Sequence, residues 1–373
     1  MADCKATSST ISQRTESRTQ TRSNMIPWLR IGIFTLFAVC GQTSAVLLTR
    51  LYYEKGGKSN WVAAVLQLIG FPILIPYYFT KQPKLMEHEV VVDEQQQQQT
   101  NNPPKLQLLV FVYVSLGILA AGNSFLYSVG FEYLPVSTVT IISASQLAFN
   151  AFFSYFLNKQ KLTPFIINSL FILTVSSVLL VANDKSGKLP GTSAGQYAAG
   201  IICTIFGAAT YALLFASQQL AFRKVLKKQT FKVVMDVIIY QFLVASIITL
   251  IGFFAAGDWR NLKTEMEGFQ LGKVSYIMTL FWTAVSYQIF NFGAVALIFE
   301  VSALFSNVIN ALGLPITPII AIFVFHDKMS GVKGISMVLA IWGFFSYVYQ
   351  QYLDDSKFNA QNYRNGGSEV CEA

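Results

Sequence analysis

Carboxamide side chains are the main polar groups that this sequence places inside its apolar segments. A carboxamide donates and accepts hydrogen bonds without charge, and within hydrocarbon it has to face a bundle interior or a wet cavity. Gln146 and Asn150 lie four residues apart, on one face of a helix. Hydrogen bonding between helices would explain any single amide. The recurrence of amides near mid-span favours a shared polar cavity.

Aromatic rings near these amides could stack on a bound solute. Trp61 and Tyr211 are candidates, with Trp282 and Tyr287 beside them, although Trp and Tyr also anchor helix ends at a membrane interface. No Lys or Arg lies in mid-span, which disfavours phosphorylated or strongly anionic solutes. We therefore expect a flat, neutral, hydrogen-bonding solute. The predicted substrate-binding residues are Trp61, Gln67, Asn123, Gln146, Asn150, Tyr211, Gln288, Asn291, Asn307 and Asn310.

Two glutamates are the single charged residues of two long apolar runs. Glu132 lies in the run 106–157, and Glu300 lies in the run 274–325. A carboxylate partly removed from water can carry a proton, so both are candidates for proton coupling; a solvated carboxylate in a turn is the alternative. Glu300 is the stronger candidate, because no charge near it in the sequence pairs with it.

The composition predicts an integral membrane protein. The chain is 53% hydrophobic and 12% charged, with a mean hydropathy of +0.47, whereas soluble domains are about 25% charged. The net charge of +8 comes from basic residues between apolar runs, which indicates membrane orientation and not nucleic-acid binding. The sequence contains no HExxH, GxSxG, P-loop or GxGxxG pattern and no CxxC pair. We therefore expect no catalytic residues, metal site or cofactor, and we do not expect an enzyme.

Runs without charge predict ten transmembrane helices, because each such helix needs about 20 apolar residues. Residues 1–26 are expected to form a disordered cytoplasmic tail, 27–350 the transporter domain, with a Gln-rich cytoplasmic loop at 81–105, and 351–373 a second cytoplasmic tail. Lys and Arg are in excess on the side of the termini, which places both in the cytoplasm. The predicted helices are 31–49, 59–80, two within 106–157, 162–183, about 196–220, 237–257, two within 274–325, and 334–353.

The helices divide into two similar sets of five, at about 27–183 and about 196–350. Because five is odd, the second set would enter the membrane the opposite way round, as in the inverted repeats of transporters. Val136-Ser137 and Val301-Ser302 match at an offset of 165 residues, and the same offset pairs Asn123 with Gln288. Ser137 and Ser302 would then be equivalent helix N-caps.

Prolines interrupt two of the predicted helices. Pro72 and Pro76 lie in the second, and Pro315 and Pro318 lie in the ninth. Broken helices are typical of transporter binding sites, and simple kinks are the alternative.

Several stretches of the chain form recognisable motifs. They include Gly41-Gln42-Thr43-Ser44, Gly56-Gly57-Lys58-Ser59-Asn60-Trp61, Ser143-Ala144-Ser145-Gln146-Leu147-Ala148-Phe149 and Ser302-Ala303-Leu304-Phe305-Ser306-Asn307-Val308. With these stretches the chain resembles the plant purine permease family, over about residues 28–350. This resemblance implies the drug/metabolite transporter fold, with ten helices in two inverted five-helix repeats. It also implies proton-coupled uptake of purine bases, adenine-type cytokinins and related heterocycles across the plasma membrane.

The expected partners are therefore a small heterocyclic solute, protons and the lipid bilayer, and no oligomeric state is predicted. Two alternatives stay open. A nucleotide-sugar or other metabolite carrier of the same fold is disfavoured by the missing cations in mid-span. A membrane receptor that binds the solute without moving it is disfavoured by the inverted repeat.

Overall fold

The structure is a computed structural model of the chain. It describes residues 2–76, 106–134, 145–160, 162–182, 193–226, 231–325 and 341–349, with isolated positions between 139 and 143 and elsewhere between 331 and 353, and it describes no side chain before Trp28. The predicted tails and the Gln-rich loop 81–105 fall wholly or mainly outside the residues whose side chains are described, and they stay predictions. Most of the predicted helix 334–353 is described, and every described position of it is helical.

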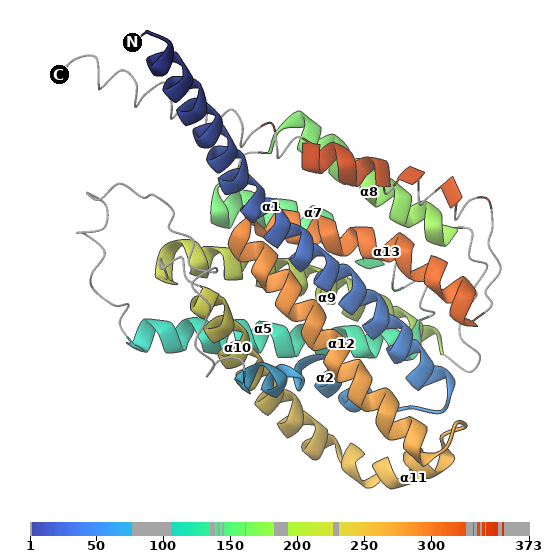
Figure 1. The fold of residues 1–373 in the computed structure, drawn as a ribbon. Helices are drawn as coiled ribbons and strands as arrows, with labels where there is room; N and C mark the ends of the chain where they lie inside the picture. The colour runs from blue at the N-terminus through green and yellow to red at the C-terminus, as the bar shows by residue number, and fades with distance from the viewer. Residues whose placement is uncertain are drawn as a thin grey trace.

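The described part of the chain is built from helices that lie side by side in one bundle (Figure 1). Its elements are α1 (Ala2–Glu54), α2 (Asn60–Leu68), η1 (Phe71–Leu74), α5 (Leu106–Tyr133), α7 (Gln146–Asn158), α8 (Pro164–Ala182), α9 (Ala194–Leu220), η3 (Ala221–Leu226), α10 (Phe231–Ala256), η4 (Asp258–Arg260), α11 (Leu262–Gly268), α12 (Lys273–Glu300) and α13 (Ala303–Phe325).

Five helical segments of the described chain are long and apolar enough to cross a membrane. In hydrocarbon the backbone has to satisfy its own hydrogen bonds, which a helix does within one segment. Three further apolar segments are shorter: Asn60–Leu74, Pro164–Ser176 within α8, and Ala303–Gly313 within α13. The five long segments are Trp28–Glu54, Leu106–Tyr133, Ala194–Leu226, Lys232–Ala256 and Lys273–Glu300.

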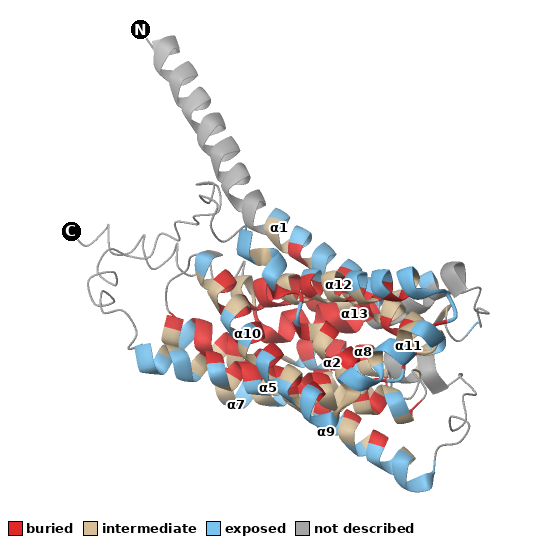
Figure 2. Cartoon of the chain, turned by 90° about the horizontal axis from the view of Figure 1, so that it is seen from below, coloured by how far each residue is buried: buried red, intermediate tan, exposed pale blue. Residues whose placement is uncertain are grey.

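Two long helix pairs form the most extensive contacts of the bundle: α1 lies along α12, and α5 lies along α9. Small residues allow the α1–α12 approach. A Cβ atom on Gly41 would lie 2.5 Å from the backbone nitrogen of Phe290, and one on Gly293 would lie 2.6 Å from that of Ala38. Such separations require glycine, as is common between membrane helices. The buried residues lie between the helices, along the middle of the bundle (Figure 2).

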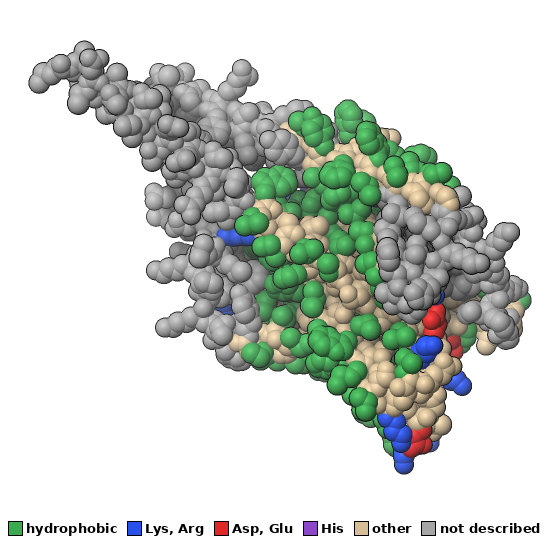
Figure 3. Space-filling view, turned by 45° about the vertical axis from the view of Figure 1, so that its right-hand side comes forward, with side chains coloured by type: hydrophobic (Ala, Val, Ile, Leu, Met, Phe, Trp, Pro, Cys, Tyr) green, Lys and Arg blue, Asp and Glu red, His purple; other side chains and the backbone are tan. Residues whose placement is uncertain are grey.

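The outer flank of the bundle is apolar, as a surface in contact with lipid has to be. Phe111 is 69% exposed and Val274 is 73% exposed. Hydrophobic side chains spread over this flank, whereas charged side chains gather at the end of the molecule where α11 lies (Figure 3). This distribution matches a protein that spans a bilayer.

Some helix boundaries differ from the expected ones. Helix α9 begins two residues before position 196, where Ser193 and Gln196 form a reciprocal capping box. The charge-free run predicted a helix from 237, but helix α10 begins at Phe231, so Asp236 lies in its second turn. Charged side chains are tolerated in the terminal turns of a membrane helix, because these turns lie near the interface.

The expected proline breaks are found in one helix and not in the other. The second helix ends at Leu68, and a 3₁₀ turn with Pro72 in its first turn follows. Helix α13 instead runs unbroken from Ala303 through Pro315 and Pro318 to Phe325, so the expected interruption there is wrong. Ser302 caps α13 as predicted, since its Oγ accepts from the Phe305 N–H at 3.1 Å; its predicted counterpart, Ser137, is outside the described residues.

Candidate substrate-binding cavity

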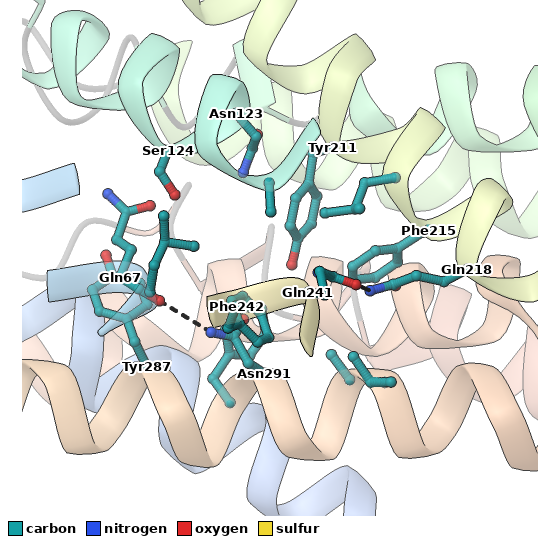
Figure 4. Close-up of a pocket in the computed structure, with 16 residues that line it drawn as sticks. Gln67, Asn123, Ser124, Tyr211, Phe215, Gln218, Gln241, Phe242, Tyr287 and Asn291 are labelled. Atoms are coloured by element: carbon teal, nitrogen blue, oxygen red, sulfur yellow. Dashed lines mark hydrogen bonds between the residues drawn. The ribbon is translucent and has the colours of Figure 1, made fainter. Parts of the chain in front are cut away.

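One cavity lies at the centre of the bundle, where α2, α5, α9, α10 and α12 meet (Figure 4). The space between its side chains, including its open mouth, is about 450 Å³. We call it the central cavity. Its lining residues are Gln67, Leu68, Ala120, Asn123, Ser124, Tyr211, Leu214, Phe215, Gln218, Gln241, Phe242, Tyr287, Phe290, Asn291, Ala294 and Val295.

Four predicted site residues line this cavity: Gln67, Asn123, Tyr211 and Asn291. Asn123 and Tyr211 point from α5 and α9 into the space that Asn291 enters from α12 (Figure 4). The Asn291 Nδ2 donates to the backbone oxygen of Gln67 at 3.1 Å. The Gln67 Nε2 donates to Ser128 Oγ at a longer 3.5 Å. Residues far apart in the sequence therefore form one polar surface.

Some polar atoms of the cavity wall have no hydrogen-bond partner among the residues that the structure describes. They are Asn123 Oδ1, Gln218 Oε1 and Gln241 Nε2. The three side chains are at most 8% exposed. A buried polar atom without a partner is costly, and most buried polar atoms of folded proteins are hydrogen-bonded. These three atoms are therefore the candidates in the cavity wall for hydrogen bonds to a solute.

Aromatic rings complete the wall. The rings of Tyr211 and Phe215 lie 4.5 Å apart between centroids, and Phe242 and Phe290 line the same space. Tyr287, named as an aromatic candidate from the sequence, also lines it. The Tyr211 hydroxyl oxygen accepts from Asn310 Nδ2 at 3.5 Å.

None of the lining residues is charged. A charged solute would be desolvated here without a compensating charge, at a cost that amides alone do not offset. The central cavity therefore suits a neutral solute with a flat apolar face and a polar edge.

Three predicted site residues instead join helices to one another, in what we call the α7–α13 network: Gln146, Asn150 and Asn307. The carboxamides of Gln146 and Asn307 are hydrogen-bonded to each other, and Asn307 Nδ2 also donates to the Gln146 backbone oxygen at 3.2 Å. Asn150 Nδ2 donates to the Ala303 backbone oxygen at 2.9 Å. These contacts hold the start of α13 against α7, away from the cavity lining.

Three further predicted residues lie outside the cavity lining. Asn310 reaches it only through the Tyr211 hydroxyl. Gln288 is buried on α12, and neither polar atom of its side chain has a partner in the described part of the chain. The Trp61 ring stacks on Phe125 with centroids 4.4 Å apart and packs against Gly252 of α10.

The two glutamates have partners that the sequence did not indicate. No charge near Glu300 in the sequence pairs with it, but the fold brings Arg30 Nη1 to 4.0 Å from Glu300 Oε1. The two residues are 270 positions apart, so only packing reveals the pair. Glu132, at the end of α5, accepts a hydrogen bond from Asn60 Nδ2.

Sequence reasoning missed Glu265, a carboxylate outside the spanning segments. Tyr52 and Tyr276 both donate to its Oε1, Tyr276 at 3.4 Å. Burial raises the pKa of Glu265 above its ordinary value, an effect that these hydrogen bonds oppose. Its partners come from α1 and α12, so it joins these helices at one end of the bundle.

Sequence reasoning also missed Gln218 and Gln241. Gln218 Nε2 donates to Gln241 Oε1 at 2.7 Å, between α9 and α10. Gln241 stood close to the expected helix start at 237, where an amide would meet water. Because α10 begins at Phe231, Gln241 lies nearly three turns inside the helix. If the start of this helix had been predicted at Phe231, Gln241 would have counted as a mid-span carboxamide like the other candidates.

Known proteins resemble this chain over most of its length. A family model described as purine nucleobase transmembrane transport matches residues 29–357. Purine permease 21 of Arabidopsis thaliana is 52% identical over 335 residues, which are 90% of this chain and 84% of that protein. Probable purine permease 10 of the same plant is 54% identical over 328 residues, which are 88% of this chain and 82% of that protein.

A distant solved structure shares the fold. One crystal structure, 13% identical, aligns with 86% of this chain and 97% of its own chain at a TM-score of 0.52. At that identity the likeness concerns the arrangement of helices alone.

Proposed function

This chain belongs to the family of purine nucleobase transmembrane transporters, and we propose that it is a proton-coupled secondary transporter for the uptake of purine bases, cytokinins or related neutral heterocycles. It is a multi-pass membrane protein and not an enzyme, since its relatives are named as permeases. We place substrate binding in the central cavity.

The observation that carries this proposal is an uncharged cavity lined by both amides and aromatic rings. A purine base is flat and neutral, with hydrogen-bonding groups along its edge. Tyr211, Phe215 and Phe242 offer faces for stacking, and Asn123 offers an unpaired acceptor. A cytokinin adds an apolar group to an adenine ring, for which Leu68 and Phe290 supply apolar wall.

The helix contacts support the proposed inverted five-helix repeat. If the two halves correspond, α1 matches α9, and α5 matches α12. The α1–α12 contact then corresponds to the α9–α5 contact, and these are the two most extensive contacts in the bundle. Gly41 of α1 faces Phe290 of α12, while Gly207 of α9 faces Tyr127 of α5. Two matching halves around one cavity are the arrangement expected for alternating access.

Contacts near the helix ends support the proposed alternation across the membrane. Arg30 lies by Glu300, and Arg223 Nη1 donates to the Asn158 backbone oxygen at 3.2 Å; the ten-helix topology assigns all four to the cytoplasmic side. It assigns Asn60 and Glu132, which are also in contact, to the opposite side. We propose a plasma membrane location with both termini in the cytoplasm.

Proton coupling is assigned to Glu300 or Glu132. The Arg30 guanidinium lies 4.0 Å from the Glu300 carboxylate. Release of this pair during the transport cycle would allow Glu300 to take up a proton. Glu132 has an uncharged partner, Asn60.

The test is uptake of labelled adenine and a labelled cytokinin by cells expressing the chain, with and without an inward proton gradient. Saturable uptake that collapses with the gradient is expected. Tyr211→Leu should raise KM, whereas the matched variant Tyr240→Leu, on the exposed flank of α10, should behave as the parent protein. Absence of uptake by a protein confirmed at the cell surface would contradict the proposal. Saturable binding without exchange of internal solute would indicate a receptor.

A further inference from the structure

We infer that the pair Gln218–Gln241 reads the polar edge of the base and selects rings that carry a hydrogen-bond donor beside an acceptor, namely amidine and lactam edges. This inference rests on the proposed transport of purine bases and assigns the specificity within it to two residues. Both line the central cavity, one from α9 and one from α10 (Figure 4).

The pair is buried and only half satisfied. Gln218 is 1% exposed and Gln241 is fully buried. One hydrogen bond, 2.7 Å long, joins Gln218 Nε2 to Gln241 Oε1. The remaining Gln218 Oε1 and Gln241 Nε2 have no partner within the described residues. The pair therefore leaves one acceptor and one donor unpaired on two hydrogen-bonded neighbouring side chains, away from water.

The chemistry of a complementary ligand follows from this arrangement. An adenine ring offers an exocyclic N–H donor next to a ring-nitrogen acceptor, so one edge can satisfy both atoms. Unsubstituted purine carries its own N9–H donor beside the N3 acceptor, so the comparison uses bases methylated at N9. 9-Methylpurine keeps the ring-nitrogen acceptors of 9-methyladenine but has no N–H donor, and it would leave Gln218 Oε1 unpaired. Sites built from buried polar groups strongly reject analogues that lack the matching group. We expect discrimination of at least about tenfold between these two rings.

The pair also tolerates the opposite order of groups. A carboxamide that turns by 180° exchanges its nitrogen and oxygen. If both turn, Gln241 Nε2 donates to Gln218 Oε1, and the free donor and acceptor change places. Hypoxanthine carries its acceptor and donor in the reverse order to adenine. Both bases therefore fit the same pair, while 9-methylpurine fits neither arrangement.

Aromatic rings lie beside the pair on both helices. Phe215 precedes Gln218 by about one helical turn, and Phe242 follows Gln241 directly. Both rings line the cavity and are nearly buried. A base whose edge meets the two glutamines would thus have rings available for its faces.

The first experiment uses the unaltered protein. 9-Methyladenine, 9-methylhypoxanthine and 9-methylpurine each compete with labelled adenine for uptake. We expect inhibition constants for the first two within about tenfold of each other, with 9-methylpurine at least about tenfold weaker than either. 9-Methylpurine as effective as 9-methyladenine would overturn the inference whatever the behaviour of any variant. If labelled adenine is not taken up at all, the proposed function itself fails.

The second experiment removes the pair. In Gln218→Met/Gln241→Met both carboxamides are replaced by thioether chains of similar length, so no buried amide is left unpaired. The preference for 9-methyladenine over 9-methylpurine should fall to about twofold or less. The matched control is Gln219→Met, one residue away, whose amide oxygen accepts from the Ala303 N–H and not from the cavity. It should keep the parental preference even if its surface level drops. A double variant that keeps that preference would refute the assignment.

Discussion

The central cavity and the α7–α13 network contain the same kind of side chain, buried to a similar degree. Asn150 and Asn307 are at most 1% exposed, as are Gln218 and Gln241. In the network, carboxamides are bonded to each other or to backbone atoms of the neighbouring helix. In the cavity, Gln218, Gln241 and Asn123 each keep one polar atom without a partner in the described structure. Amides buried to the same degree therefore differ between these two regions in whether their polar atoms are satisfied.

Substitutions in the two regions should differ in their effect on the free energy of unfolding. Removing one partner of a buried hydrogen bond costs about 1–3 kcal/mol, because the other is left unsatisfied. Removing a side chain whose polar atom already lacks a partner carries no such penalty. Substitutions in the network should therefore lower stability, and substitutions in the cavity should alter substrate affinity.

The largest expected change in stability is that of Asn307→Leu in the network. The variant leaves the Gln146 carboxamide without its partner and should destabilise the folded protein by about 1–3 kcal/mol. Thermal unfolding in detergent measures this loss. KM for adenine, measured on the fraction that reaches the surface, should stay at the parental value. A raised KM with unchanged stability would move Asn307 into the binding site.

The reverse pattern is expected for Asn123→Leu in the cavity. Its Oδ1 has no partner in the described structure, so the unfolding free energy should change by less than about 0.5 kcal/mol. KM for adenine should rise about tenfold, which is the equivalent of about 1.4 kcal/mol. The same two assays, run beside Asn307→Leu, test the comparison directly. Loss of stability without a change in KM would show that Asn123 acts in packing.

A smaller effect is expected where the two regions meet. The Tyr211 hydroxyl accepts a long hydrogen bond of 3.5 Å from Asn310, so Tyr211→Phe removes a weak contact and keeps the ring. KM should rise by no more than about threefold, or roughly 0.7 kcal/mol. Tyr211→Leu, which removes the ring, should raise it further. Equal KM values for the two variants would show that the hydroxyl, not the aromatic face, binds the substrate.

Charged pairs extend the comparison to groups that could move protons. The ion pair between Arg30 and Glu300, at 4.0 Å, should add at most about 1 kcal/mol to stability. Glu300→Gln should keep adenine uptake but remove its dependence on the proton gradient. Arg30→Gln breaks the same pair and should keep that dependence. If both variants respond to the gradient as the parent does, Glu132→Gln becomes the variant to measure.

The smallest effect concerns Glu265, a carboxylate with two tyrosine donors. Because its pKa in the folded protein is raised, the folded state holds the proton more tightly than the unfolded chain. Its contribution to stability is therefore present at pH values below the ordinary glutamate range and is lost as pH rises through the raised pKa. In thermal unfolding measured against pH, Glu265→Gln should flatten this decline. An unchanged pH profile would contradict the assignment.

Much of the architecture was predictable from local sequence. Apolar runs predicted the helical segments α1, α5, α9, α10 and α12, because hydropathy and length are properties of a single stretch. The boundaries were wrong where charged residues continue a helix, as in α10. The repeated order of apolar runs and the absence of mid-span cations also indicated a transporter for a neutral solute.

The sequence by itself determined the membrane class of this protein, its helical segments and the uncharged, amide-rich chemistry of its interior. Only the tertiary structure decided which amides hold helices together and which face the cavity. Gln146 is hydrogen-bonded to a residue 161 positions away, and Gln218 of α9 is hydrogen-bonded to Gln241 of α10. Hydropathy acts along the chain, whereas hydrogen-bond satisfaction depends on which helices pack together and at what rotation.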